Sequence, residues 1–192
     1  MARQKEFDRD DVLERAMRLF WAQGYEATSM GDLVEHLGIG RQSLYDTFGD
    51  KHQLYLAALD RYRQQFGGCV PTALADATPV RRAIRDVFER TLAAGVAEGG
   101  RGCMMVCATV ERCPSDGDVL QRATDNASGL ERAFHDRLLR ARRDGEIGPH
   151  QDPTALARYL TNSLFGLGVS AKLGRSKDEL RAVIDVTLSV LG

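Results

Sequence analysis

The sequence predicts an all-α protein, and three features of the chain support this fold class. Apolar residues recur at three- and four-residue intervals over most of the 192 residues. No segment shows the strict apolar–polar alternation of a half-buried strand. Glycines, prolines and capping side chains divide the periodic stretches into about nine helices, three short ones followed by longer ones.

The first three helices are predicted in the first quarter of the chain. Asp8 is a candidate N-cap for the first helix, which ends before Gly24. The pattern Ser29-x-x-Asp32 is a capping box for the second helix, which stops at Gly38. These signals predict helices over residues 7–22, 29–37 and 41–48.

The later helices begin at equally clear signals. Asp50 can cap a fourth helix, and Thr78-Pro79 and Asp152-Pro153 each place a capping residue before a proline at the first helical position. The predicted helices span residues 51–66, 79–97, 103–113, 119–143, 153–173 and 177–191. The change in helix length predicts two domains, residues 1–50 and 51–192.

The stretch "GIGRQSLYDTFGDKHQL", residues 38–54, joins two of the short helices through a tight turn. Gly38 can adopt the left-handed backbone that this turn needs, which completes a helix-turn-helix pattern. An exposed polar helix of this kind fits the major groove of DNA, whereas an ordinary helical hairpin with a solvated face is the alternative. The side chains expected to point outward are those of Arg41, Gln42, Ser43 and Tyr45.

Composition limits the possible partners and location. No apolar run approaches eighteen residues, so no membrane partner is expected. The N-terminus, "MARQKEFDRDD", lacks the apolar core of a secretory signal, and we therefore expect a cytoplasmic protein whose four cysteines are mostly reduced. Residues 1–55 hold seven Lys or Arg and ten Asp or Glu, an acidic balance for a DNA-binding segment. Acidic residues at helix starts act as caps, however, and need not face DNA.

The stretch "GYEATSMGDLVEHLGIGRQSLYDTFGDKHQLYLAAL", residues 24–59, resembles the N-terminal signature of the TetR family (TetR/AcrR) of bacterial transcriptional repressors. Val34 stands where the family usually has alanine, and Gly40 stands where it usually has serine, which predicts a weaker cap for the next helix. The matching positions are Phe20, Gly24, Tyr25, Thr28, Ser29, Leu33, Gly38, Ile39, Leu44, Tyr45, Phe48, Lys51 and Leu54. The resemblance implies a three-helix DNA-binding domain followed by a helical bundle for ligand binding and dimerisation.

The same resemblance implies specific DNA contacts. It assigns the family's phosphate contacts to Thr28 or Ser29, Tyr45 and Lys51. Arg41 and Gln42 are the best candidates for base edges, because their side chains can make bidentate contacts. The implied partner is a palindromic double-stranded DNA operator that a homodimer binds.

The last two predicted helices carry long apolar stripes. A four-helix interface between two chains would cover them, and a core within one chain is the alternative. The predicted interface residues are Leu156, Tyr159, Leu160, Leu164, Leu167, Leu180, Ile184 and Leu188.

The resemblance also implies a ligand pocket among the middle helices. Aromatic residues and methionines would make it apolar and adaptable, with Glu111 as a polar anchor, although such residues more often form plain core. The predicted lining residues are Tyr62, Phe66, Phe88, Met104, Met105, Cys107, Glu111, Phe134 and Phe165. We expect a small apolar or aromatic effector that releases the repressor from its operator, with helix 51–66 linking the pocket to the DNA-binding helix.

The segment "GCMMVCATVERCP", residues 102–114, places Cys103 and Cys107 on one face of a helix. Cys103 falls in the first turn, where the helix dipole lowers a thiol pKa. Plain packing, a redox or electrophile sensor and soft-metal binding are all open interpretations. The segment contains no histidine, which makes metal binding the weakest of them, and no metal or cofactor is predicted.

Motifs of the common enzyme classes are missing from the sequence. The chain has no GxSxG, phosphate-binding loop, HExxH or dinucleotide-binding fingerprint. Only Cys103 and Cys107 could support catalysis, as in a small thiol oxidoreductase, but their spacing differs from the CxxC redox motif. We therefore expect a regulator that is not an enzyme, with a thiol-sensing repressor as the alternative to a ligand-responsive one.

Overall fold

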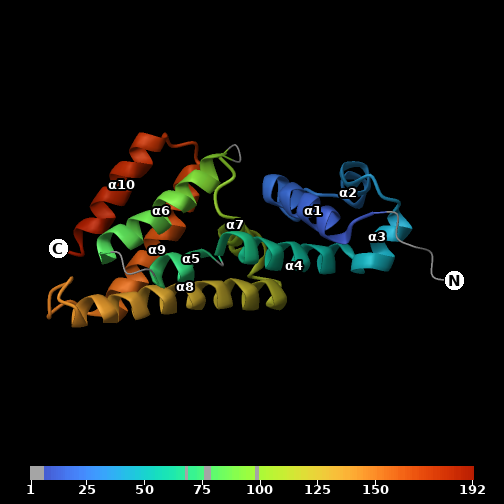
Figure 1. Cartoon of the computed structure of the whole chain (residues 1–192). Helices are drawn as coiled ribbons and strands as arrows, with labels where there is room; N and C mark the ends of the chain where they lie inside the picture. Colours follow the sequence, from blue (N-terminus) through green and yellow to red (C-terminus); the bar gives the residue numbers. More distant parts are fainter. Residues whose placement is uncertain (1–6, 68, 76–78, 98–99) are drawn as a thin grey trace.

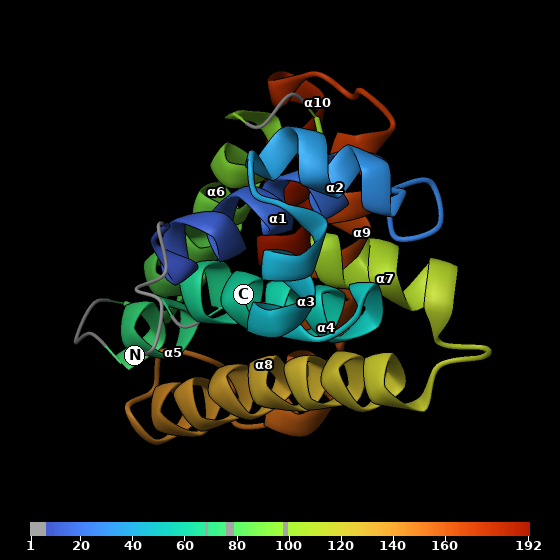
Figure 2. The ribbon, with the colours of Figure 1, turned by 90° about the vertical axis from the view of Figure 1, so that its right-hand side faces the viewer.

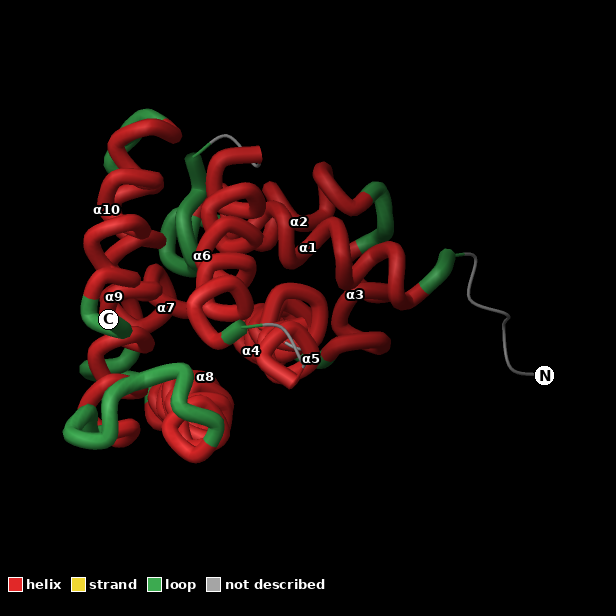
Figure 3. Tube along the Cα trace, turned by 60° about the vertical axis from the view of Figure 1, so that its left-hand side comes forward, coloured by secondary structure: helices red, strands yellow, loops and turns green. Residues whose placement is uncertain are grey.

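The computed structural model describes residues 7–67, 69–75, 79–97 and 100–192, and within these ranges the protein is helical without strands (Figures 1 and 3). The predicted all-α fold is therefore confirmed. None of the described helices combines the length and the hydropathy that a membrane crossing requires.

The N-terminal unit consists of three helices, α1 (Arg9–Gln23), α2 (Met30–Leu37) and α3 (Arg41–Phe48). The Asp8 carboxylate accepts hydrogen bonds from the backbone of the first turn of α1, and Ser29 and Asp32 form the predicted reciprocal capping box of α2. Gly38 ends α2 with φ of 66°, a conformation that favours glycine. Gly40 caps α3 without any side-chain hydrogen bond, as predicted from the missing serine.

The remaining helices follow the predicted segments, with their ends within two residues of the expected positions except after Tyr62. There the α-helix ends and a short π-helix, η1, continues to Gly67. These elements are α4 (Lys51–Tyr62), η1 (Arg63–Gly67), α6 (Val80–Ala97), α7 (Met104–Arg112), α8 (Gly117–Arg143), α9 (Pro153–Lys172) and α10 (Lys177–Ser189). The predicted cap at Thr78 lies outside the described residues.

The structure adds one short helix, α5 (Cys69–Ala75), to the predicted set. No helix was predicted between residues 66 and 79, and Pro71 lies in the first turn of α5. A proline in the first turn breaks no hydrogen bond, because the first backbone N–H groups of a helix have no partner within it.

Two hydrophobic cores organise these helices. The first joins α1–α4 to α7, and it includes the buried residues Leu33, Leu37 and Leu44 of the helix-turn-helix. The second joins α5, α6, α8, α9 and α10. Figure 1 shows the N-terminal unit at one end of the molecule and α4 running from it toward the C-terminal helices, and Figure 2 shows the same unit in front of them. The division at residue 50 stays a prediction, because α4 and α7 pack into the core of the N-terminal unit.

The apolar stripes of α9 and α10 mostly serve the core of one chain. Six of the eight predicted interface residues are buried in the single chain: Leu160, Leu164, Leu167, Leu180, Ile184 and Leu188. Leu156 is partly buried, and Tyr159 is 41% exposed. The intramolecular alternative is therefore correct for those six residues. The large apolar side chains that stay exposed on these helices and just after α9 are Tyr159, Val169, Leu173, Val183 and Val186.

Candidate DNA-binding surface and effector cavity

The exposed face of α3 carries the predicted base-contacting side chains. Arg41, Gln42 and Ser43 are exposed, and Tyr45 is 37% exposed, whereas Leu44 is fully buried beneath them. The helical period thus divides this short helix into a buried face and an outward polar face, as the sequence predicted.

Two contacts within α3 hold its outward side chains. The Gln42 amide donates to the Asp46 carboxylate over 2.9 Å, and the Arg41 guanidinium lies 5.8 Å from the Tyr45 ring centroid. Asp46 was absent from the predicted site, although its place one turn after Gln42 could have indicated it. A carboxylate on this face can accept a hydrogen bond from a cytosine amino group. It also repels DNA phosphates, because both groups are negatively charged.

The structure corrects one predicted phosphate contact. The Thr28 side chain is fully buried, and its hydroxyl donates to the Gly24 carbonyl oxygen over 2.6 Å. It therefore stabilises the α1–α2 loop (residues 24–29) from inside. Ser29 is exposed, although its hydroxyl accepts a hydrogen bond from the Asp32 backbone N–H, and it remains the candidate of the pair.

Lys51, at the start of α4, lies against the α1–α2 loop. Its ammonium is 4.2 Å from the centroid of the Tyr25 ring, which the Arg112 guanidinium also approaches to 4.5 Å. Two cations on one aromatic ring place positive charge beside the exposed surface of α3 and α4. This local charge offsets the acidic balance of the first 55 residues, in which Asp8, Asp32 and Asp50 cap helices as predicted.

Residues at the C-terminal end of α7 bind the same α1–α2 loop. The Glu111 carboxylate accepts hydrogen bonds from the backbone N–H groups of Tyr25 and Glu26, over 3.0 and 2.8 Å. Arg112 pairs with Glu26 and, over 3.2 Å, with Asp116. Glu111 is thus not the predicted anchor of a pocket, because the backbone of the α1–α2 loop occupies its carboxylate.

Asp116 extends this network to the first turn of α4. Its carboxylate lies 2.9 Å from Nε2 of His52 and accepts a hydrogen bond from the backbone N–H of Val119. Burial alone would raise the pKa of Asp116, but the hydrogen bonds from Val119, His52 and Arg112 hold this pKa below its ordinary value. His52, Asp116 and Asp118 lie close enough together for their ligand atoms to contact one metal ion. The Asp116 carboxylate, however, is already hydrogen-bonded by its protein neighbours.

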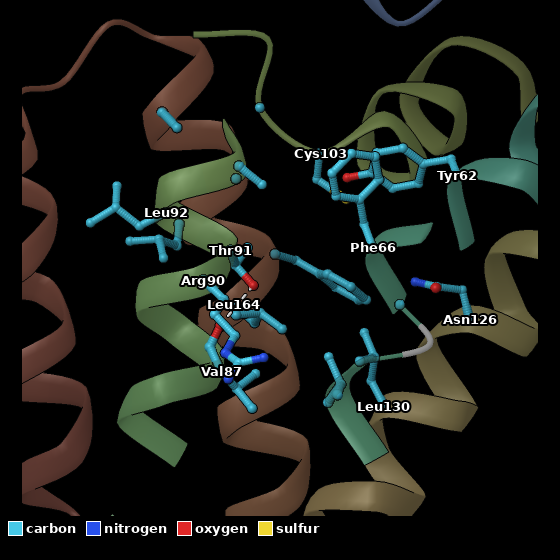
Figure 4. Close-up of a pocket in the computed structure, with 18 of the residues that line it drawn as sticks. Tyr62, Phe66, Val87, Arg90, Thr91, Leu92, Cys103, Asn126, Leu130 and Leu164 are labelled. Atoms are coloured by element: carbon cyan, nitrogen blue, oxygen red, sulfur yellow. Dashed lines mark hydrogen bonds between the residues drawn. The ribbon is translucent and has the colours of Figure 1, made fainter. Parts of the chain in front are cut away.

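A cavity of about 200 Å³ lies between α4, η1, α5, α6, α8 and α9 (Figure 4). Three predicted lining residues, Tyr62, Phe66 and Phe165, do line it. Most of the remaining surface is aliphatic and comes from Val70, Val87, Leu92, Leu130, Leu164 and Leu167. The cavity is therefore apolar, as predicted, but different residues build most of it.

Five of the other predicted lining residues lie elsewhere. Phe88 and Phe134 are fully buried in the second core, where their ring centroids are 6.4 Å apart. Met104 and Met105 belong to the first core, and Cys107, on α7, is not among the lining residues of the cavity. Helical periodicity marks all of these residues as inward-facing, but it cannot separate a cavity wall from a filled core.

Two glycines shape one wall of the cavity. A side chain at Gly102 would meet the Gly168 carbonyl oxygen at 2.5 Å, and one at Gly168 would meet the Cys103 side chain at 2.9 Å. The segment that enters α7 can therefore lie directly on α9. This close approach places Cys103 in the wall of the cavity.

The two cysteines of α7 differ in their surroundings. Burial raises the pKa of the Cys103 thiol, so the lowering expected from the helix dipole does not prevail. Cys107, one turn later, is partly buried like Cys103, but Nζ of Lys172 lies 3.2 Å from its sulfur. The sequence could not reveal this lysine, which approaches from α9.

Comparisons with known proteins agree with this geometry. The family of bacterial regulatory proteins named after tetR matches residues 12–58, and the tetracyclin repressor-like C-terminal domain matches residues 79–187. The chain is 41% identical to the uncharacterized HTH-type transcriptional regulator YezE of Bacillus subtilis, with full coverage of both proteins. It is 35% identical to the HTH-type transcriptional repressor ComR of Escherichia coli, over 97% of this chain and 90% of ComR.

A solved structure shows the same fold on DNA. A cysteine mutant of the TetR family regulator CifR, complexed with a 26-bp double-strand operator, has a TM-score of 0.90 and 32% identity, with full coverage of both chains. The chain therefore belongs to the TetR family of DNA-binding bacterial transcriptional regulators, in agreement with its fold and with the outward face of α3.

Proposed function

We propose that the chain is a homodimeric repressor that leaves a palindromic operator when a small apolar or aromatic molecule fills the cavity. The relative ComR is a transcriptional repressor, and a cysteine mutant of the structural neighbour CifR is complexed with operator DNA. The observation that carries the proposal is a direct contact between the DNA-binding unit and the cavity: Trp21 of α1 contacts three residues that line the cavity.

Trp21 makes three contacts with residues that line the cavity. The Trp21 ring lies edge-on to the rings of Tyr62 and Phe66, with centroids 5.1 and 5.3 Å apart. Its indole N–H donates to the Gly102 carbonyl oxygen over 3.1 Å. Tyr62, Phe66 and Gly102 all line the cavity, so a ligand that displaces them changes the packing of α1. The sequence predicted that α4 alone links the cavity to the DNA-binding helix. We now propose that both α4 and Trp21 transmit the effect of ligand binding.

Operator binding would use the outward face of α3 and the start of α4. In this proposal Arg41 and Gln42 contact base edges, while Ser29, Tyr45 and Lys51 contact phosphates, and the exposure of Ser29, Arg41, Gln42 and Tyr45 supports it. A dimer would present two such faces to successive major grooves, about 34–40 Å apart. The exposed apolar side chains of α9 and α10, including Val183 and Val186, are the surface that we assign to the dimer contact.

Operator selection from a randomised duplex library tests this proposal, followed by release assays with a panel of uncharged aromatic and aliphatic compounds. We expect a palindromic consensus, a dimeric mass in light scattering and release by members of the panel. A monomer at micromolar concentration, or a consensus without two-fold symmetry, would contradict the proposal.

A thiol-sensing repressor is the second candidate, and the contact between Lys172 and Cys107 favours it. Reactive cysteines lie in electropositive, partly exposed surroundings, and the Lys172 ammonium lies 3.2 Å from the sulfur of the partly buried Cys107. Cys103 is also partly buried, but desolvation raises the pKa of its thiol, which disfavours its thiolate form. With N-ethylmaleimide, the thiolate would add to the carbon–carbon double bond, and the adjacent carbon would take a proton from water.

The Cys107→Ser variant separates the two candidates, with Cys113→Ser as a matched control on another partly buried thiol. If Cys107 is the sensor, maleimide releases the operator from the wild type and from Cys113→Ser but not from Cys107→Ser. Release that persists in Cys107→Ser would eliminate this candidate. A thiol oxidoreductase receives no support, because Cys103 and Cys107 lack the spacing of the CxxC redox motif.

A further inference from the structure

We propose that the effector is an anionic amphiphile, with its apolar part in the cavity and its negative group on Arg90. This inference rests on the proposed effector function of the cavity and adds the charge of the ligand.

The charge of the described cavity lining is one-sided. Arg90, from α6, is its one charged side chain, and no carboxylate lies among the described lining residues. The remaining polar side chains are neutral: Gln65, Thr91 and Asn126, besides the hydroxyl of Tyr62 and the thiol of Cys103. Arg90 would repel a protonated amine, and no carboxylate in the described lining would offset this repulsion. The same arginine would attract an anionic ligand.

Arg90 also differs from Arg81 and Arg85 of α6, whereas the side chain of Arg82, outside the cavity lining, likewise has no hydrogen bond or ion pair with the described residues. Arg81 donates to the carbonyl oxygens of Leu188 and Gly192, and Arg85 pairs with Asp185 over 2.7 Å. Arg90 has neither a hydrogen bond nor an ion pair with the described part of the chain, although Asp86 lies one turn before it. Its guanidinium is therefore available to bind a carboxylate through two parallel hydrogen bonds.

The position of Arg90 matches an amphiphile rather than a fully polar anion. Its side chain is exposed, so it lies where the cavity meets solvent and a bound charge keeps part of its hydration. Beyond it, the walls are formed by Phe66, Leu130 and Leu164, which can hold an aliphatic or aromatic body.

Asn126 supplies a second polar group on the opposite wall. Figure 4 shows it projecting from α8, across the cavity from Arg90 on α6. Its amide has no hydrogen-bond partner in the described structure, so it can donate to or accept from a polar atom of the ligand. The two groups would orient a ligand that an apolar cavity alone would not orient.

Three eight-carbon probes of different charge test the proposal: octanoate, octanol and octylamine. Trp21 is the single tryptophan of the chain and contacts three lining residues, so its fluorescence serves as the readout of occupancy. We expect octanoate to bind at least tenfold more tightly than octanol and to release the selected operator, and octylamine to bind most weakly.

Arg90→Gln tests the residue assignment. It should remove the advantage of octanoate and leave octanol affinity unchanged, because the substitution keeps the polar chain but removes the charge. Arg82→Gln is the matched control, since Arg82 is an exposed arginine of α6 outside the cavity lining. Circular dichroism should show equal thermal stability of both variants and the wild type.

The possible failures are distinguishable. Equal or tighter binding of octanol or octylamine to the wild type would overturn the anionic assignment while leaving an effector site. Octanoate preference that survives in Arg90→Gln would overturn the role of Arg90. If no probe changes Trp21 fluorescence, the charge proposal fails. If the uncharged panel also leaves the operator bound, the effector function of the cavity fails with it.

Discussion

The N-terminal unit and the effector cavity place their functional groups in opposite ways. In α1–α3, the candidate DNA contacts are exposed on a helix whose other face is buried, so Gln42 and Leu44 differ completely in exposure two residues apart. In the cavity, functional groups and core residues share the same inward faces of α6, α8 and α9. Substitutions in the first region should therefore separate function from stability cleanly, whereas those of the buried cavity walls should not, and the exposed Arg90 is the exception.

The largest expected effect comes from the buried side of α3. Leu44→Ala removes a fully buried side chain between α2 and α3 and should lower the free energy of unfolding by about 2–5 kcal/mol. Urea denaturation followed by far-UV circular dichroism measures it. Operator binding should fall with stability. A change below about 0.5 kcal/mol would show that exposure does not separate the two faces of this helix.

The exposed side of α3 should show the converse behaviour. Gln42→Ala should leave the unfolding free energy within about 0.5 kcal/mol and lose about 1–3 kcal/mol of discrimination at particular base pairs. Lys51→Ala should weaken all operator sequences alike and reduce the salt dependence by about one counterion. Binding to a set of operator variants at several salt concentrations tests both. A uniform loss in Gln42→Ala would contradict its assignment to bases.

The contact between the two regions should give a smaller effect. Glu111→Gln leaves one acceptor oxygen for two backbone N–H groups, so the α1–α2 loop loses a hydrogen bond worth about 1–2 kcal/mol. We expect weaker operator binding with unchanged octanoate affinity in the absence of DNA. Glu131→Gln is the control, because Glu131 makes a surface ion pair with Arg158. Equal operator affinity in both variants would show that Glu111 does not position the loop.

The smallest effect is a pH dependence at the same contact. The pKa of Asp116 is held below its ordinary value in the folded chain, so its ionised form contributes stability above the unfolded-state pKa. This contribution is lost as the pH falls through the folded pKa, in the acid range below about pH 4. Melting temperatures of wild type and Asp116→Asn should converge as the pH is lowered from neutral to about 3. Parallel curves would exclude a role for Asp116 in acid sensitivity.

The dimer surface illustrates what a periodic pattern can and cannot show. Leu160 and Leu164 have the spacing expected for an interface, but both are buried within one chain. Val183 and Val186 have the same apolar character and stay exposed. A helix with apolar residues on more than one face buries only the face that its own neighbours cover, and the sequence does not say which face that is.

The sequence by itself determined the helices, their caps and the two faces of α3, because these features depend on residues within one or two turns of each other. The tertiary structure alone decided the positions of Glu111, Arg90 and the Lys172–Cys107 pair, whose surroundings come from segments distant in sequence. Hydrogen bonding across 86 residues or a charge at a cavity mouth leaves no local pattern. The physical reason is that periodicity encodes only whether a residue faces inward, while its partner depends on how whole helices pack.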